Sequence, residues 1–203
     1  RRRKTDGYDV SDHGVVRAVA KGVRKTSSRF GARLEPFMHV DVQLAVGRNL
    51  DIISQAVTLD AFGARIGNDY PQYTAGSANL ETAAQLVDED EESANAQYVL
   101  LISALNSLVR AEHDPGVILD SYQLRALSIA GYAPSFDACA QCEAPGPHRS
   151  FHAPSGGILC DNCRVPGSNA PSALAVGLLG ALLSGDWLVI DSSDERSRRE
   201  ASS

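Results

Sequence analysis

The four cysteines of this chain form two C-x-x-C pairs, Cys139 with Cys142 and Cys160 with Cys163, separated by seventeen residues. Each pair can form a short knuckle that presents two thiolates, and the intervening segment can bring both pairs around one tetrahedral metal ion. We therefore predict a zinc site. Because four thiolates leave no coordination position for water, the zinc is expected to hold structure and not to perform chemistry.

Other interpretations of the cysteines are weaker. A pair of disulfides requires an oxidising compartment, and no signal peptide is recognised in the sequence. His148 and His152 lie between the two pairs and have the chemistry to replace a cysteine as ligand, but four well-spaced thiolates already complete the site. Four unrelated buried thiols would have to produce the two C-x-x-C pairs by accident.

Charge is unevenly distributed along the chain, whose net charge is −6. Residues 1–35 contain ten Lys and Arg against four Asp and Glu, whereas the remainder contains nine against twenty-one. Such asymmetry points to a local nucleic-acid surface. We predict that cations in and after this segment bind the phosphates of DNA: Arg17, Lys21, Arg24, Lys25, Arg29, Arg33 and Arg48.

The alternative for these cations is an ordinary solvated strand face. Phe30 and Phe37 lie among the cations and have rings that can stack on exposed bases, but we expect both in the hydrophobic core.

No convincing catalytic centre is found in the sequence. Lys4-Thr5-Asp6-Gly7 matches the K-x-D-G pattern of enzymes that adenylate a lysine, but those enzymes need a large nucleotide-binding domain that this chain has no room for. Neither a phosphate-binding glycine loop nor a nucleophile motif is present. We therefore predict that the protein is not an enzyme, with a ligase-like activity as a remote alternative.

Periodicity predicts strands first and helices afterwards. Residues 40–44 alternate between apolar and polar side chains, Gly47-Arg48-Asn49 forms a turn, and 50–59 is a second β-rich segment. After Asp60 the apolar spacing becomes helical, with helices expected around 80–87, 98–108, 117–130 and 174–183. The expected fold class is α+β, a small barrel followed by a helical domain. No apolar stretch is long enough for a membrane span, so a cytoplasmic protein is expected.

Several segments resemble the bacterial RecO (recombination protein O) family, especially its actinobacterial members. In the first half these are 14–25, Ser28-Arg29-Phe30-Gly31, Leu34-Glu35-Pro36-Phe37 and Gly47 to Ile52. In the second half they are 124–127, 131–134, the four cysteines and Gly156-Gly157. The two blocks occur in the family's order and separation, and the resemblance covers residues 13–190.

The resemblance implies an N-terminal OB-fold, a helical domain with a zinc knuckle, and a role in DNA repair and recombination through the RecF pathway. It implies binding of single- and double-stranded DNA and annealing of complementary strands at the nucleoid. It also implies contact with single-strand-binding protein and, together with RecR, help in loading RecA onto the strands that this protein coats. A zinc-stabilised protein-interaction module is the alternative.

The predicted domains are a divergent tail (1–12), an incomplete OB-fold-like barrel (13–62), a helical domain (63–190) with its knuckle at 139–163, and a disordered tail (191–203). The family usually has further strands before Asp12-His13-Gly14 and a long helix after Trp187. On this basis the chain is expected to be a fragment, and loss of function is one possible consequence.

Overall fold

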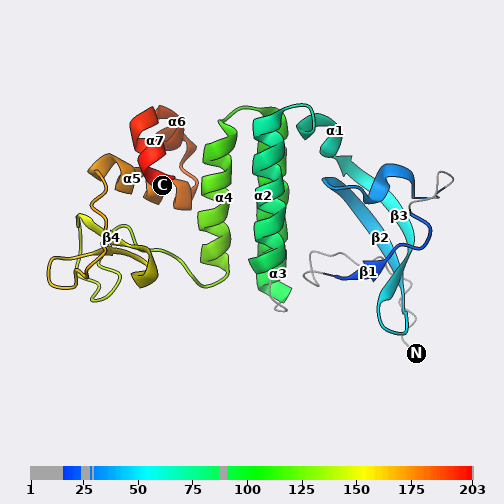
Figure 1. The fold of residues 1–203 in the computed structure, drawn as a ribbon, viewed down its shortest axis with the longest axis horizontal. Coiled ribbons are helices and arrows are strands. Elements are labelled where there is room, and N and C mark those ends of the chain that lie inside the picture. Colours follow the sequence, from blue (N-terminus) through cyan, green and yellow to red (C-terminus); the bar gives the residue numbers. More distant parts are fainter. Residues whose placement is uncertain (1–15, 24–27, 29, 87–90, 203) are drawn as a thin grey trace. The chain divides into compact units, whose positions relative to one another are not determined.

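The computed structural model describes residues 16–23, 28, 30–86 and 91–202 (Figure 1). The chain divides into two compact units, Arg1–Glu112 and His113–Ser203, and each is described by itself. Strands are concentrated in the first unit and both units contain helices, so the predicted α+β class is confirmed. The divergent tail predicted at 1–12 and the lysine of the K-x-D-G match lie outside the described residues.

The N-terminal unit begins with a three-stranded sheet. Its strands are β1 (Ala18–Val19), β2 (Met38–Ala45) and β3 (Asp51–Ala61). β3 lies between the other two, antiparallel to β2 and parallel to β1. The strand predicted at 40–44 lies within β2, and the one predicted at 50–59 lies within β3 except for Leu50, so both predictions are confirmed.

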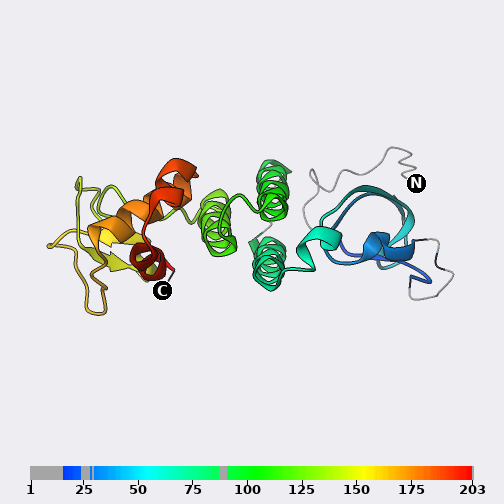
Figure 2. The ribbon, with the colours of Figure 1, turned by 90° about the horizontal axis from the view of Figure 1, so that it is seen from above.

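The hairpin formed by β2 and β3 is bent. Register shifts between His39 and Val40, and between Gln43 and Leu44, interrupt its ladder, and such bulges increase local bend and twist. Figure 2 shows the curvature of the two strands. Among the residues that the structure describes, the sheet does not close into a barrel, because β1 pairs through only two residues. The OB-fold therefore stays a prediction.

Phe37 packs this sheet region against two long helices that lie next to each other, as the view in Figure 2 shows. A β-carbon added at Gly76 would lie 3.0 Å from the Phe37 ring and 3.5 Å from the Leu108 side chain, so the ring fills the space between the helices. Phe30 and Phe37 are both buried, which confirms the core assignment. Besides its strands, this unit contains η2 (Gly31–Leu34), α1 (Gly63–Ile66) and the two long helices, α2 (Tyr70–Leu86) and α3 (Glu91–Arg110).

The C-terminal unit is built around an apolar core between its helices. Asp114 caps the first of them by accepting a hydrogen bond from the backbone N–H of Gly116, and Ser172 caps the second by accepting from Ala175. Val117 and Leu182 are among the core residues where these helices meet. The helices are α4 (Pro115–Ile129), α5 (Ala173–Ser184), α6 (Trp187–Ser192) and α7 (Glu195–Ala201).

The disordered tail predicted from residue 191 is wrong, because α6 extends to Ser192 and α7 follows. Asp194 caps α7 by accepting hydrogen bonds from the backbone N–H and hydroxyl of Ser197, at 2.9 and 2.8 Å. Arg198 donates to the carbonyl oxygens of Ile190 and Asp191, which satisfies the end of α6. Polar composition alone suggested disorder, but the polar side chains are used for caps. No helix in the described parts of the chain is both long and apolar enough to cross a membrane.

Candidate metal centre and nucleic-acid interface

The first cysteine pair lies in a tight knuckle between α4 and the next strand. The backbone N–H of Cys139 donates to the carbonyl of Ala144 at 2.8 Å, and Glu143 donates back to the Cys139 carbonyl at 2.8 Å. Glu143 has a φ of 60°, a left-handed conformation that lets the chain reverse. The knuckle therefore points Cys139 and Cys142 to the same side.

The second pair follows a short hairpin that is joined to the first knuckle by backbone pairing. Strands β4 (Ser150–His152) and β5 (Gly157–Leu159) are antiparallel, with η3 (Ala153–Ser155) between them. Ile158 donates to the Ser135 carbonyl at 2.9 Å, and Ala140 donates to the Ile158 carbonyl at 2.8 Å. Because Cys160 directly follows β5, these bonds bring it to the first pair.

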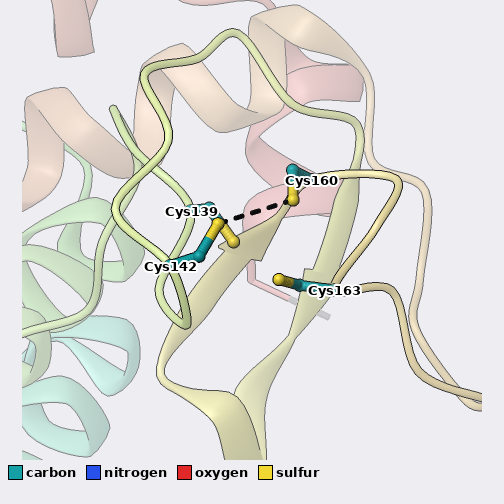
Figure 3. A group of neighbouring side chains, drawn as sticks. All are labelled: Cys139, Cys142, Cys160 and Cys163. Carbon is teal, nitrogen blue, oxygen red and sulfur yellow. Dashed lines mark hydrogen bonds between the residues drawn. The ribbon is translucent and has the colours of Figure 1, made fainter.

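The four sulfur atoms face one another, as Figure 3 shows, and all lie within 4.8 Å of each other. The sulfurs of Cys142 and Cys160 are 3.7 Å apart. Four sulfurs at the usual Zn–S distance of about 2.3 Å in a tetrahedron would be about 3.8 Å apart. The observed cluster fits a metal ion with four thiolate ligands, as the spacing predicted.

Ionisation of the thiols also favours a cation here. The backbone N–H of Cys160, with those of Gln141 and Cys142, lowers the pKa of Cys139 to about 6. The neighbouring sulfurs of Cys142 and Cys160 raise the pKa of Cys163 to about 12. The cluster therefore stabilises one thiolate by itself, and a divalent cation would supply the charge that lets the others ionise.

The two histidines considered as replacement ligands make other contacts. His148 Nε2 is 2.9 Å from the carbonyl oxygen of Ala144, and His152 Nδ1 is 2.7 Å from the hydroxyl of Ser155. Neither belongs to the cluster, whose members are the four cysteines. The cysteines are also free thiols in this structure, with no disulfide among them.

The seven cations predicted to bind DNA have different placements. Arg17 and Lys21 flank β1, which pairs with β3 at Asp51 and Ile52, directly after the turn that carries Arg48. Those three cations are exposed at one end of the sheet, whereas exposed Arg33 lies in η2. Arg24, Lys25 and Arg29 lie outside the described residues.

Comparison with known proteins identifies the family over nearly the whole chain. Residues 11–62 match "Recombination protein O N terminal", and residues 67–203 match "Recombination protein O C terminal". The chain belongs to the RecO family. It is 57% identical to the DNA repair protein RecO of a Nocardioides species over 192 residues, which cover 93% of this chain and 79% of that protein.

Other RecO relatives give the same result. The DNA repair protein RecO of Thermobifida fusca is 53% identical, with 93% of this chain and 78% of the relative covered. That of Streptomyces griseus is also 53% identical, covering 94% of this chain and 79% of the relative.

One feature of this RecO-family chain that motif spacing did not reveal is the support for the metal ligands. Gly157, at φ 147°, lies so close to the backbone of Ser135 that an added β-carbon would be 2.2 Å from its carbonyl oxygen. This close approach allows the two hydrogen bonds that Ser135 makes with Gly156 and Ile158, on either side of Gly157. Its only signal in the sequence is the Gly156-Gly157 pair.

The C-terminal unit also contains a mainly apolar pocket of about 940 Å³ beside the metal module. Phe136 and Phe151, whose rings stack 6.3 Å apart, line it together with Leu124 from α4. Glu200 on α7 forms part of the wall and accepts hydrogen bonds from the backbone N–H and hydroxyl of Ser172. The local sequence gives no pattern for this pocket, because its lining comes from five separate segments.

Proposed function

We propose that the protein acts in DNA repair and recombination as a non-enzymatic mediator that binds single- and double-stranded DNA and anneals complementary strands. Membership of the RecO family and the relatives' name, DNA repair protein RecO, support the repair role. The single structural observation that supports DNA binding is the exposure of Arg17, Lys21 and Arg48 on segments that the pairing of β1 with β3 brings together. Acting on bacterial DNA, the protein would work in the cytoplasm at the nucleoid.

The mechanism follows from charge neutralisation. Lys and Arg side chains replace the counterions on the phosphates of two strands, which lowers the repulsion between them. Base pairing then supplies the specificity, so no catalytic group is needed. The proposed partners are RecR and single-strand-binding protein, with RecA loaded indirectly in the RecF pathway.

The sheet is proposed to be part of an OB-fold. Its support is the bent β2–β3 hairpin, whose two register shifts resemble the bulges that turn strands around a small barrel. OB-folds bind oligonucleotides on their strands and in neighbouring loops, and the exposed cations lie in such a place.

The thiolate cluster is proposed to hold one structural Zn²⁺ through Cys139, Cys142, Cys160 and Cys163. A zinc ion would supply positive charge and a tetrahedral link between two knuckles that have little apolar core of their own. The chain's own contribution is to hold the four sulfurs together through the backbone bonds of Ser135, Ala140 and Ile158.

A strand-annealing assay with two complementary labelled oligonucleotides tests the proposal across a salt series, with and without bound single-strand-binding protein. The unmodified protein should accelerate annealing, and the effect should weaken steeply with salt. R17A/K21A/R48A should lower the slope of log affinity against log salt by roughly two to three, because three phosphate contacts are lost.

The matched control R110A/R149A/R164A removes three exposed arginines from other parts of the chain and should leave annealing unchanged. An equal loss of annealing activity in both variants would contradict a specific DNA-binding surface at this end of the sheet. Annealing that does not depend on salt would contradict the charge-neutralisation mechanism.

The pocket of the C-terminal unit favours a second candidate, a zinc-stabilised protein-interaction module whose cations are incidental. This candidate expects a folded, zinc-loaded protein that has no affinity for DNA. It also expects binding to RecR or single-strand-binding protein that survives in R17A/K21A/R48A. Loss of DNA affinity in that variant would favour the mediator instead.

A further inference from the structure

The pairing of β1 with β3 brings cations close to the turn that joins β2 to β3. In the parallel ladder, Ala18 lies opposite Asp51 and Val19 opposite Ile52. Arg17, directly before β1, therefore lies beside the turn that contains Arg48. Lys21 follows β1 on the side away from this turn. The described segment 16–23 and the turn 45–50 contain no acidic residue, so the cations are not paired by their own segments.

The same end of the sheet exposes aliphatic side chains. Val46 is 77% exposed and Leu50 is 48% exposed, one on each side of Arg48. Val19 in β1 and Val16, two residues before β1, are 38% and 37% exposed. Exposed aliphatic groups keep the unfavourable free energy of apolar hydration, and contact with a ligand would remove it. A cluster of them is therefore a candidate for ligand contact.

The turn holds the two aliphatic residues in place. A β-carbon at Gly47 would lie 1.8 Å from the carbonyl oxygen of Leu50, so only glycine allows the chain to close this tightly. The backbone N–H of Gly47 donates to the carboxylate of Asp51 at 3.3 Å, which ties the turn to the start of β3. Val46 and Leu50 are thus displayed on a closed turn, and little ordering is needed when they make contact.

We propose that Val46 and Leu50 contact unstacked bases of single-stranded DNA while Arg17, Lys21 and Arg48 hold its phosphates. Aliphatic side chains that enter between bases replace part of the stacking, and flanking cations supply the attraction to the backbone. This inference rests on the proposed DNA-binding function and adds the residues that face the bases. It makes the hairpin turn the part of the protein that keeps a strand unstacked before it pairs.

An anionic membrane surface would also accept cations mixed with aliphatic groups. DNA is favoured here because the chain belongs to a family whose relatives are named as DNA repair proteins. Vesicles of phosphatidylglycerol therefore form a separate arm of the test.

The test compares V46S/L50S with the matched control V57S/L59S. Val57 and Leu59 are each 58% exposed and lie in the second half of β3, away from the turn. With a fluorescein-labelled oligothymidylate as probe, V46S/L50S should bind about tenfold more weakly at every salt concentration. Its salt slope should equal that of the unmodified protein, because no phosphate contact is removed. V57S/L59S should bind normally.

A second measurement reports on the bases directly. The unmodified protein should raise the fluorescence of 2-aminopurine in a single strand, since unstacking removes the quenching by its neighbours. V46S/L50S should lose this rise, whereas R48A should keep it once DNA is saturated. Circular dichroism and zinc content of each variant establish that it is folded.

Equal affinities of the two double variants, or a 2-aminopurine signal that V46S/L50S retains, would overturn the inference while leaving DNA binding intact. Binding to phosphatidylglycerol vesicles that V46S/L50S abolishes, with DNA affinity unchanged, would overturn it in favour of a membrane surface. If the unmodified protein does not bind DNA, the proposed function itself fails.

Discussion

The metal cluster and the cationic sheet end are built in opposite ways. In the C-terminal unit, four sulfurs face inward and backbone hydrogen bonds between two knuckles hold them within 4.8 Å. In the N-terminal unit, Arg17, Lys21 and Arg48 face solvent, and a ladder of two residue pairs brings their segments together. Backbone hydrogen bonds hold the ligand atoms of the first site in one arrangement, whereas the second site leaves its side chains exposed to follow a flexible strand.

Removing the metal should have the largest effect on the folding of the C-terminal unit and should separate the two sites most clearly. Binding at structural zinc sites is worth roughly 10–16 kcal/mol and is coupled to folding. Chelation, or C142S, should therefore unfold the metal module and lower the helical signal in circular dichroism, with one zinc per chain lost in mass spectrometry. DNA binding by the N-terminal unit should be less affected.

The control for this experiment is H148A/H152A. It removes the two histidines that contact Ala144 and Ser155 instead of the metal cluster, so the variant should retain zinc. An unchanged spectrum after complete chelation would argue against a structural metal.

A methyl group at Gly157 should have the next largest effect. In G157A the new β-carbon would overlap the Ser135 backbone, and the chain would have to separate the two knuckles. Zinc affinity should fall roughly tenfold to a hundredfold, as for other changes in the support of metal ligands. A competition titration with a chromogenic chelator measures it.

G156A is the matched control for G157A. Its added β-carbon would meet nothing within 4 Å, although its φ of 79° still carries strain. Only a small fall in zinc affinity is expected. Similar affinities for the two variants would show that the Ser135–Gly157 contact does not support the site.

The two sites also differ in how much of each could be predicted from the sequence. The spacing of the cysteines predicted the cluster because ligand pairs within one knuckle are local. The grouping of Arg17 with Arg48 could not be predicted, since it depends on a parallel strand pairing that two residues make. The aliphatic pair Val46 and Leu50 was missed because exposure cannot be inferred from a turn's composition. The predicted disorder beyond 191 failed because capping by Asp194 was overlooked.

Capping of α7 provides a smaller test. D194A removes the acceptor for Ser197, and loss of an N-cap typically costs about 1 kcal/mol. The free energy of unfolding of the C-terminal unit should fall by that amount in urea titrations, with DNA affinity unchanged. D194N should recover most of the loss. A drop in DNA affinity would show that the stability of the C-terminal unit affects DNA binding.

The smallest expected effect concerns pH. Hydrogen bonds from the hydroxyl and backbone N–H of Ser172 lower the pKa of Glu200 below its ordinary value of 4.5. Because the folded pKa is the lower one, this stabilisation is present above 4.5 and is lost as pH falls through the folded pKa.

E200Q should therefore show a weaker fall of the urea midpoint below pH 4.5 than the unmodified protein. E195Q, which changes an exposed carboxylate at the start of α7, serves as the control. Identical pH profiles for E200Q and the unmodified protein would show that the bond to Ser172 does not contribute.

The bond between Ser202 and Asp120 joins α7 to α4 across 82 residues of chain. During synthesis at roughly 5–20 residues per second, α4 leaves the ribosome about four to sixteen seconds before its partner. Until α5 and α6 have also been synthesised, its apolar face, including Val117, has neither helix to cover it. The C-terminal unit is thus a region where a nascent chain is exposed to chaperones, and slow codons between α4 and α7 would lengthen that exposure.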